Sequence, residues 1–178
     1  IEDLDLIPSP YTSGVFDDFF NFPLIPLFET NRGCPFACTF CSDGIDFKSR
    51  VFRYSQARTD QTLEYISKRV TNCNELIVTD LNFGMYEADL ITAKKIAQIK
   101  SKTGYPISFL GTAGKNKPER TIEVTNIIDE KGMIGAALQS TDPEVLAAIK
   151  RSNISIEKYF KITSYGKEKG AFTYSEII

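Results

Sequence analysis

The chain alternates between short apolar segments and amphipathic segments, and this alternation limits its possible folds more than any other feature. The apolar segments are typical of buried strands, and helical patterns lie between them. The expected strands cover residues 26–30, 75–80, 107–112, 133–140 and 171–178. The expected helices cover residues 58–72, 87–102, 119–131 and 155–168, with a short helix beginning at Asp142 and Pro143. The spacing is near the roughly 30 residues of a strand–helix–strand unit, which predicts an α/β fold with a parallel sheet and helices outside.

Polar residues stand at the ends of four of these expected strands. Chemistry in parallel α/β folds lies at the carboxyl ends of the strands, so these side chains are expected to share one site. They are three cysteines after the first strand, Asp80 and Asn82 at the second, Thr112 and the weaker candidate Lys115 at the third, and Gln139 and Ser140 at the fourth.

The composition removes several classes of function. The chain has 178 residues, no histidine and a formal net charge of −2. Histidine-based triads and zinc sites with histidine ligands are therefore excluded from this segment. No basic footprint for nucleic acid and no membrane span is evident in the sequence. Residues 1–23, rich in proline and glycine, read as an irregular lead-in, and residues 24–178 carry the alternating pattern.

Three cysteines lie within eight residues, in the segment Arg32-Gly33-Cys34-Pro35-Phe36-Ala37-Cys38-Thr39-Phe40-Cys41. Thiolates are soft ligands that suit iron–sulfur clusters, and this spacing lets one short loop hold three corners of a [4Fe–4S] cubane. The fourth iron would then stay open to a small chelating molecule. Such clustering points to a reducing, cytoplasmic compartment. The alternatives are a zinc site, which usually needs four ligands, and buried thiols.

Cys73 stands apart from the other cysteines, at the end of an expected helix. We interpret it as a small buried hydrophobic residue; the alternative is that it is a fourth ligand of the cluster.

The spacing of Cys34, Cys38 and Cys41, with aromatic Phe40 before the last cysteine, resembles the radical S-adenosylmethionine (radical SAM) enzymes. The resemblance extends over most of the chain. It implies a partial parallel (βα) barrel, of which about five of six βα units are present and the C-terminal end is missing. It also implies that a [4Fe–4S] cluster reductively cleaves S-adenosylmethionine to a 5′-deoxyadenosyl radical.

The resemblance further implies which residues meet S-adenosylmethionine. Asp80 and Asn82 match the position that accepts hydrogen bonds from its amino group, although a capping turn would explain the same residue types. Gln139 and Ser140 match a ribose-contacting pair. Arg151 matches an arginine that reaches the carboxylate, with a surface salt bridge as the alternative. Phe40 would shield the cluster, and Thr112 completes the set of candidates.

The segment before the cysteines, from Pro8 to Gly33, resembles the linker of the cobalamin-dependent branch of this family. It implies an absent upstream domain that binds cobalamin, and a function as part of a cobalamin-dependent methyltransferase or a related radical enzyme. The implied partners are a metabolite substrate of unknown identity and an electron donor such as flavodoxin or ferredoxin. Two alternatives remain open: a cobalamin-independent radical SAM enzyme such as a methylthiotransferase, and a non-catalytic iron–sulfur or zinc module.

Overall fold

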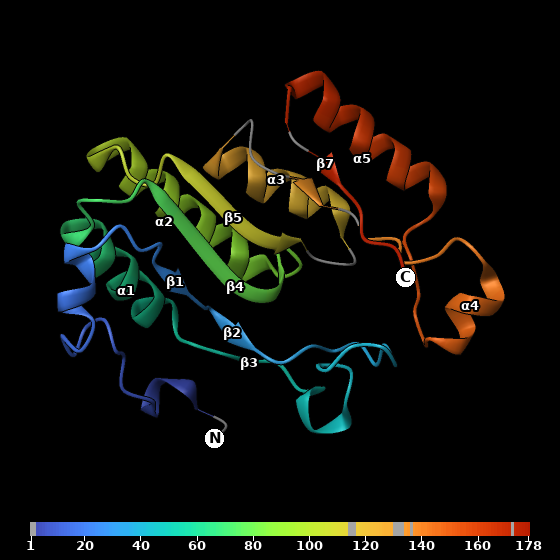
Figure 1. Cartoon of the computed structure of the whole chain (residues 1–178), viewed down its shortest axis with the longest axis horizontal. Helices are drawn as coiled ribbons and strands as arrows, with labels where there is room; N and C mark the ends of the chain where they lie inside the picture. The colour runs from blue at the N-terminus through green and yellow to red at the C-terminus, as the bar shows by residue number, and fades with distance from the viewer. Residues whose placement is uncertain (1–2, 114–116, 130–133, 136, 172) are drawn as a thin grey trace.

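A parallel sheet with helices packed against it forms the centre of the molecule (Figure 1). The computed structural model describes residues 3–113, 117–129, 134–135, 137–171 and 173–178. Three parallel strands lie in the order β1-β4-β5, and two further strands, β6 and β7, pair with each other in parallel. The bounds of these strands are β1 Leu27–Phe28, β4 Glu75–Phe83, β5 Ser108–Ala113, β6 Ile134–Gly135 and β7 Thr173–Tyr174. The predicted α/β class with a parallel sheet is confirmed.

Five α-helices connect or follow these strands in the part of the chain that the structure describes. Their bounds are α1 Gln56–Arg69, α2 Glu87–Thr103, α3 Pro118–Ile128, α4 Pro143–Ala148 and α5 Ile156–Lys169. Neighbouring helices α1, α2 and α3 contact one another in chain order, and α5 contacts α3 and β7. Among the described helices, none has the length and apolarity that crossing a bilayer requires.

Local sequence signals account for where several helices begin and end. The hydroxyl of Ser55 accepts a hydrogen bond from the Arg58 amide at 3.1 Å and starts α1 two residues before the expected position. The carboxylate of Asp142 caps α4 by accepting from the amides of Glu144 and Val145. Gly104 ends α2 in the left-handed conformation, as expected. The glycine expected to end α3, Gly132, and parts of the strand expected over residues 133–140 lie outside the described residues.

The hydrophobic core lies between the sheet and helices α1, α2 and α3. Leu76 and Val78 of β4 are each 1% exposed and belong to the same cluster as Ile66 of α1 and Ile96 of α2. Burial of such a side chain contributes about 1.5–3 kcal/mol. The apolar residues of these strands and helices therefore face the core, as their spacing in the sequence predicts.

Strand β4 is longer than the sequence predicted, and this changes the setting of its polar residues. The buried positions alternate through Leu76, Val78, Asp80 and Asn82, so the two polar residues continue the buried face of the strand. The register with β5 shifts between Val78 and Phe83, which marks a bulge in this stretch. Asp80 and Asn82 are thus strand residues and not members of a loop after the strand.

The structure contains one strand pair that the sequence did not predict. Strands β2 (Asn31–Arg32) and β3 (Phe52–Arg53) pair antiparallel, with Asn31 opposite Arg53 and Arg32 opposite Phe52. The residues between these two strands form a long loop, which contains all three clustered cysteines and whose two ends are joined by this short strand pair. The strand expected over residues 26–30 is correspondingly reduced to two residues in β1.

The lead-in segment packs on the sheet at the side of β1. The Tyr11 hydroxyl donates to the Leu27 carbonyl at 2.7 Å and accepts from the Leu27 amide at 3.1 Å. Tyr11 is 8% exposed and belongs to the main core cluster. A single side chain therefore satisfies backbone groups of an edge strand that another strand would otherwise pair with.

Candidate functional site

The cysteine loop, which we define as residues 33–45, extends from the C-terminal side of the parallel sheet (Figure 1). Cys34 and Cys38 are each 2% exposed and Cys41 is half-buried, and all three are free thiols. Backbone hydrogen bonds fold the loop tightly: the Cys41 amide donates to the Cys38 carbonyl at 3.1 Å, and the Gly44 amide donates to the Cys41 carbonyl at 3.0 Å. Cys38 and Cys41 are therefore held in one short turn, and the Cys34 amide is fixed separately by donating to the Lys48 carbonyl at 2.9 Å.

Two glycines allow this loop to approach other backbone closely. Gly33 has φ +104°, and a Cβ atom there would lie 2.1 Å from the Arg50 carbonyl oxygen. A Cβ atom at Gly44 would lie 2.1 Å from the Cys38 carbonyl oxygen. Both positions exclude any side chain.

Asp80 is fully buried, and hydrogen bonds surround its carboxylate. Oδ1 accepts from the backbone amide of Thr30 at 2.6 Å and from that of Asn31 at 3.3 Å. Oδ2 accepts from the Thr30 hydroxyl and from the Asn31 side-chain amide at 2.6 Å. Desolvation by burial raises the pKa of Asp80 to about 6, against the lowering effect of the hydrogen bonds from Thr30 and Asn31. The sequence predicted that Asp80 accepts hydrogen bonds from S-adenosylmethionine. In the structure its carboxylate instead accepts them from Thr30 and Asn31, which lead into the cysteine loop.

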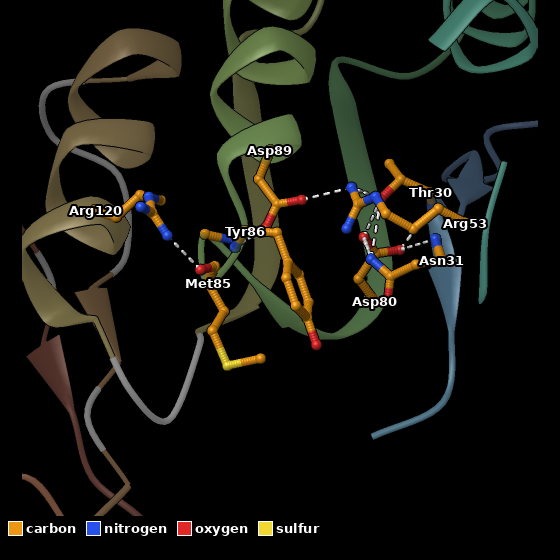
Figure 2. A network of polar contacts seen from close by, with 9 residues as sticks. Thr30, Asn31, Arg53, Asp80, Met85, Tyr86, Asp89 and Arg120 are labelled. Atoms are coloured by element: carbon orange, nitrogen blue, oxygen red, sulfur yellow. Dashed lines mark hydrogen bonds and ion pairs between the residues drawn. The ribbon is translucent and has the colours of Figure 1, made fainter. Parts of the chain in front are cut away.

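An ion pair between Arg53 and Asp89 links Thr30, a hydrogen-bond donor to Asp80, to the start of α2 (Figure 2). Arg53 donates through Nη2 to Asp89 Oδ1 at 2.7 Å and to the Thr30 hydroxyl at 3.2 Å. Asp89 is 0% exposed, and its other oxygen accepts from the amides of Gly84 and Tyr86 at 2.9 and 3.0 Å. Asp89 therefore fixes the turn that directly follows β4.

A second arginine holds the same turn from the other side. Arg120 of α3 donates to the Met85 carbonyl at 2.6 Å (Figure 2). Sequence patterns did not indicate Asp89 or Arg120, because a charged residue in an amphipathic helix is normally a solvated surface position. Thr30 and Arg53 carry no sequence signal of their own and were also missed.

Asn82 is a predicted site residue that lies against Cys34. Its side chain is 2% exposed, and Nδ2 donates to Cys34 Sγ at 3.4 Å. Its Oδ1 is buried and has no hydrogen-bond partner among the described residues. A buried carbonyl oxygen without a partner costs free energy, so this atom is suited to accept from a bound donor.

Arg151 forms a second wall of the cysteine loop, beside Cys38. It is 8% exposed, and its guanidinium contacts Cys38 Sγ at 3.9 Å, the Ala137 carbonyl, and Asn153 Oδ1 at 2.7 Å. The Thr39 amide also donates to the Ile149 carbonyl at 3.1 Å, which ties the loop to the same segment. The arginine is thus buried beside a thiol, and the alternative of an exposed surface salt bridge does not describe it.

Gln139 and Ser140 lie near this wall, but their side chains have protein partners. The Gln139 amide donates to Glu176 Oε2 at 3.1 Å, and its backbone has φ +65°. The Ser140 hydroxyl accepts from the Asp142 amide at 3.1 Å. Asn153 joins this strand end to Arg151 by donating to the carbonyls of Leu138 and Ser140.

The remaining candidates are more peripheral. Phe40 is 44% exposed within the cysteine loop, and Thr112 is exposed at the end of β5. Lys115 lies outside the described residues. Cys73 precedes β4, whereas Asn82 and its contact with Cys34 stand near the strand's far end. Seven residues of extended strand span about 23 Å, so Cys73 is separated from the cysteine loop.

The side chains of the cysteine loop are chemically suited to hold a [4Fe–4S] cluster. Three soft thiols share one turn, two of them are buried, and polar groups of Asn82 and Arg151 approach two of the sulfur atoms. Within the described residues, no three His, Cys, Asp or Glu side chains close around a single metal ion. The unpartnered Oδ1 of Asn82 supplies an acceptor beside the same thiol.

The fold is that of the radical SAM partial barrels. The structure of the radical S-adenosylmethionine methyltransferase TsrM from Kitasatospora setae, solved with cobalamin and a [4Fe–4S] cluster, superposes with a TM-score of 0.69. The match covers 90% of this chain and 32% of that one at 14% sequence identity, so it establishes the fold alone.

In sequence, the chain is homologous to a segment of cobalamin-dependent radical SAM methyltransferases. It is 32% identical over 180 residues to the 2-(S-pantetheinyl)-carbapenam-3-carboxylate methyltransferase of Streptantibioticus cattleyicolor. It is 29% identical to the cobalamin-dependent radical SAM methyltransferase TokK of Streptomyces tokunonensis. Each match covers 96% of this chain, and the chain spans 26% of the length of either relative. No family model matches the chain.

These comparisons confirm the resemblance to the radical SAM enzymes and to their cobalamin-dependent methyltransferase branch.

Proposed function

We propose that this chain is the cluster- and S-adenosylmethionine-binding segment of a cobalamin-dependent radical SAM methyltransferase. The observation that carries the proposal is the loop of three thiols, held against Asn82 and Arg151 in a chain homologous to such methyltransferases. Cys34, Cys38 and Cys41 would hold the cluster, which when bound supplies the electron that cleaves S-adenosylmethionine to a 5′-deoxyadenosyl radical.

The residues of the chain bind and orient the methionine end of S-adenosylmethionine. Asn82 Oδ1 accepts a hydrogen bond from the ammonium group, because it is the buried acceptor without a partner. The Arg151 guanidinium lies beside Cys38 of the same loop and pairs with the carboxylate. Asp80 acts through the protein: its carboxylate fixes Thr30 and Asn31, which lead into the loop.

The rest of the proposal concerns a longer protein. Radical SAM barrels of this type have six βα units, and we assign about five of them to residues 24–178. Residues 1–23 would join this segment to an upstream domain that holds cobalamin. A metabolite of unknown identity would receive the methyl group, and a flavodoxin or ferredoxin would supply the electron. We retain Thr112, Gln139 and Ser140 as candidate contacts to the nucleoside, and Phe40 as a shield of the cluster.

Electron paramagnetic resonance of the anaerobically reconstituted and reduced protein tests the proposal. We expect a [4Fe–4S]⁺ signal that shifts when S-adenosylmethionine is added, because its amino and carboxylate groups chelate the iron that has no cysteine ligand. Cys38→Ala should abolish the cluster, whereas Cys73→Ala, the matched control, should leave the signal intact. A cluster signal that ignores S-adenosylmethionine would favour an electron-transfer module, and zinc in place of iron would refute the proposal.

A further inference from the structure

We propose that the side-chain amide of Asn82 is a two-sided link, which donates to the Cys34 sulfur and accepts from the ammonium of S-adenosylmethionine. Through this link the bound ammonium would change the reduction potential of the cluster. The inference rests on the proposed function and adds a means of regulation to the same site.

The geometry of Asn82 supports both sides of the link. Nδ2 lies 3.4 Å from Cys34 Sγ, and Oδ1 is buried with no partner among the described residues. Asp80, two residues earlier on the same buried face, has both of its oxygens engaged by Thr30 and Asn31. Of these two predicted acceptors, Asn82 is therefore the one with capacity for a new hydrogen bond.

The charges around the link favour a cationic donor. Burial raises the pKa of the Tyr86 hydroxyl, and the nearby negative charges of Cys34, Asp89 and Asp80 raise it further, against the opposing charge of Arg53. Tyr86 is thus within electrostatic reach of three groups that can carry negative charge and of one arginine. An ammonium group near Asn82 Oδ1 would reduce this excess of negative charge.

The link has a consequence for electron transfer. A hydrogen bond to a cluster thiolate stabilises the more negative, reduced cluster and raises its potential. Hydrogen bonds in series polarise one another, so an ammonium on Oδ1 strengthens the N–H donation to the sulfur. By reciprocity, reduction of the cluster tightens the binding of S-adenosylmethionine.

The test compares two variants that separate the donor from the acceptor. Asn82→Asp keeps an acceptor oxygen and loses the N–H donor, whereas Asn82→Leu loses both. Asn126→Asp is the matched control, since Asn126 of α3 also has a buried, unpartnered Oδ1 and donates through Nδ2 to the Tyr165 hydroxyl at 2.7 Å. The midpoint potential is measured by redox titration without and with S-adenosylmethionine, and affinity by calorimetry on the oxidised protein.

We expect both Asn82 variants to have a more negative midpoint potential than the unsubstituted protein when no S-adenosylmethionine is present. Asn82→Asp should retain affinity for S-adenosylmethionine, whereas Asn82→Leu should weaken it about 10- to 100-fold, the effect of losing a hydrogen bond to a charged group. The change of potential that S-adenosylmethionine causes should shrink in Asn82→Leu. The control should match the unsubstituted protein in every measurement.

Potentials in both Asn82 variants equal to that of the control would overturn the inference. So would loss of the cluster from a folded Asn82→Asp protein, because a hydrogen-bond link predicts an altered cluster and not an absent one. Failure of the proposed function has a different signature, since the unsubstituted protein would then hold no cluster or ignore S-adenosylmethionine.

Discussion

The Asp80 carboxylate accepts hydrogen bonds from both the backbone amide and the hydroxyl of Thr30. Backbone pairing between β1 and β4 is registered only at Leu27 with Ile77 and at Phe28 with Val78. The side chain of Asp80 therefore connects β4 to the segment after β1, beyond the point where the backbone pairing of the two strands ends. Thr30 stands four residues before Cys34, so this contact sets the path of the chain into the cysteine loop.

Removal of this carboxylate should destabilise the protein strongly. Asp80→Ala leaves the buried donors of Thr30 and Asn31 without an acceptor, and we expect a loss of about 2–5 kcal/mol in the free energy of unfolding. Urea denaturation monitored by circular dichroism measures it. Asp142→Ala, which removes only a helix cap, should cost about 1 kcal/mol. Equal losses in the two variants would show that Asp80 is no special anchor.

The raised pKa of Asp80 predicts a particular dependence of stability on pH. The folded protein holds this proton up to about pH 6, whereas an unfolded aspartate releases it near 3.8. The folded state therefore binds more protons in this window, and the Asp80 contribution to the free energy of unfolding falls as pH rises from about 4 to 6.

The total fall is at most about 3 kcal/mol. Asp80→Asn cannot ionise, so this part of the slope should vanish in denaturation curves recorded across the window for the cluster-free protein. An unchanged slope would mean that Asp80 titrates normally in the fold.

Glycine substitutions separate backbone conformation from close approach. Gly33 and Gly104 both have positive φ, but a Cβ atom at Gly33 meets the Arg50 carbonyl, whereas one at Gly104 meets nothing within 4 Å. Gly104→Ala should cost about 1–2 kcal/mol, the penalty of the left-handed conformation. Gly33→Ala should cost more and lower the iron content after reconstitution. A Gly33→Ala protein with normal stability and iron content would refute the close approach.

The buried ion pair should be more sensitive than an exposed one. Arg53→Gln leaves the fully buried Asp89 without its cation, and we expect a loss of about 3–5 kcal/mol. Lys95→Gln removes an ion pair of comparable length, to Glu64 at 2.5 Å, whose carboxylate is half exposed, and it should change stability little. Denaturation of both variants at one pH makes the comparison, and similar losses would contradict it.

Arg151→Met should affect ligand binding while preserving much of the buried volume. The variant loses the guanidinium that lies beside Cys38 and that we pair with the carboxylate of S-adenosylmethionine. We expect affinity to fall about 10- to 100-fold in calorimetry on the reconstituted protein. Arg58→Met, which removes a donor to the Ile7 carbonyl far from the loop in sequence, is the control and should bind normally. Normal affinity in Arg151→Met would exclude this pairing.

The elements with many regular residues were predictable from the sequence. Helices α1, α2 and α5 appear near their expected positions because apolar periodicity is strong over long segments. Strands β2 and β3 have two residues each and are separated by 19 residues, so no periodic signal in the sequence indicates them. The alternation of Leu76 and Val78 with the buried Asp80 and Asn82 could have shown that β4 continues through its polar residues.

The thiols of the candidate site were predictable because their spacing in the chain is itself the signal. The partners of those thiols were not. Arg53 meets Asp89 across 36 positions, and Arg151 meets Cys38 across 113 positions. Contacts at such separations depend on how the whole sheet is assembled, and one sequence contains no direct sign of them.

The two walls of the cysteine loop, at Asn82 and Arg151, come from separate parts of the chain that both follow the cysteines. This affects the order in which the site can be made. During synthesis from the amino terminus, Cys34, Cys38 and Cys41 leave the ribosome well before Asn82 and more than a hundred residues before Arg151. At about 5–20 residues per second, the thiols wait some seconds for their second wall. A cell that loads iron and sulfide onto this loop therefore gains from delivering them after translation, to a folded chain.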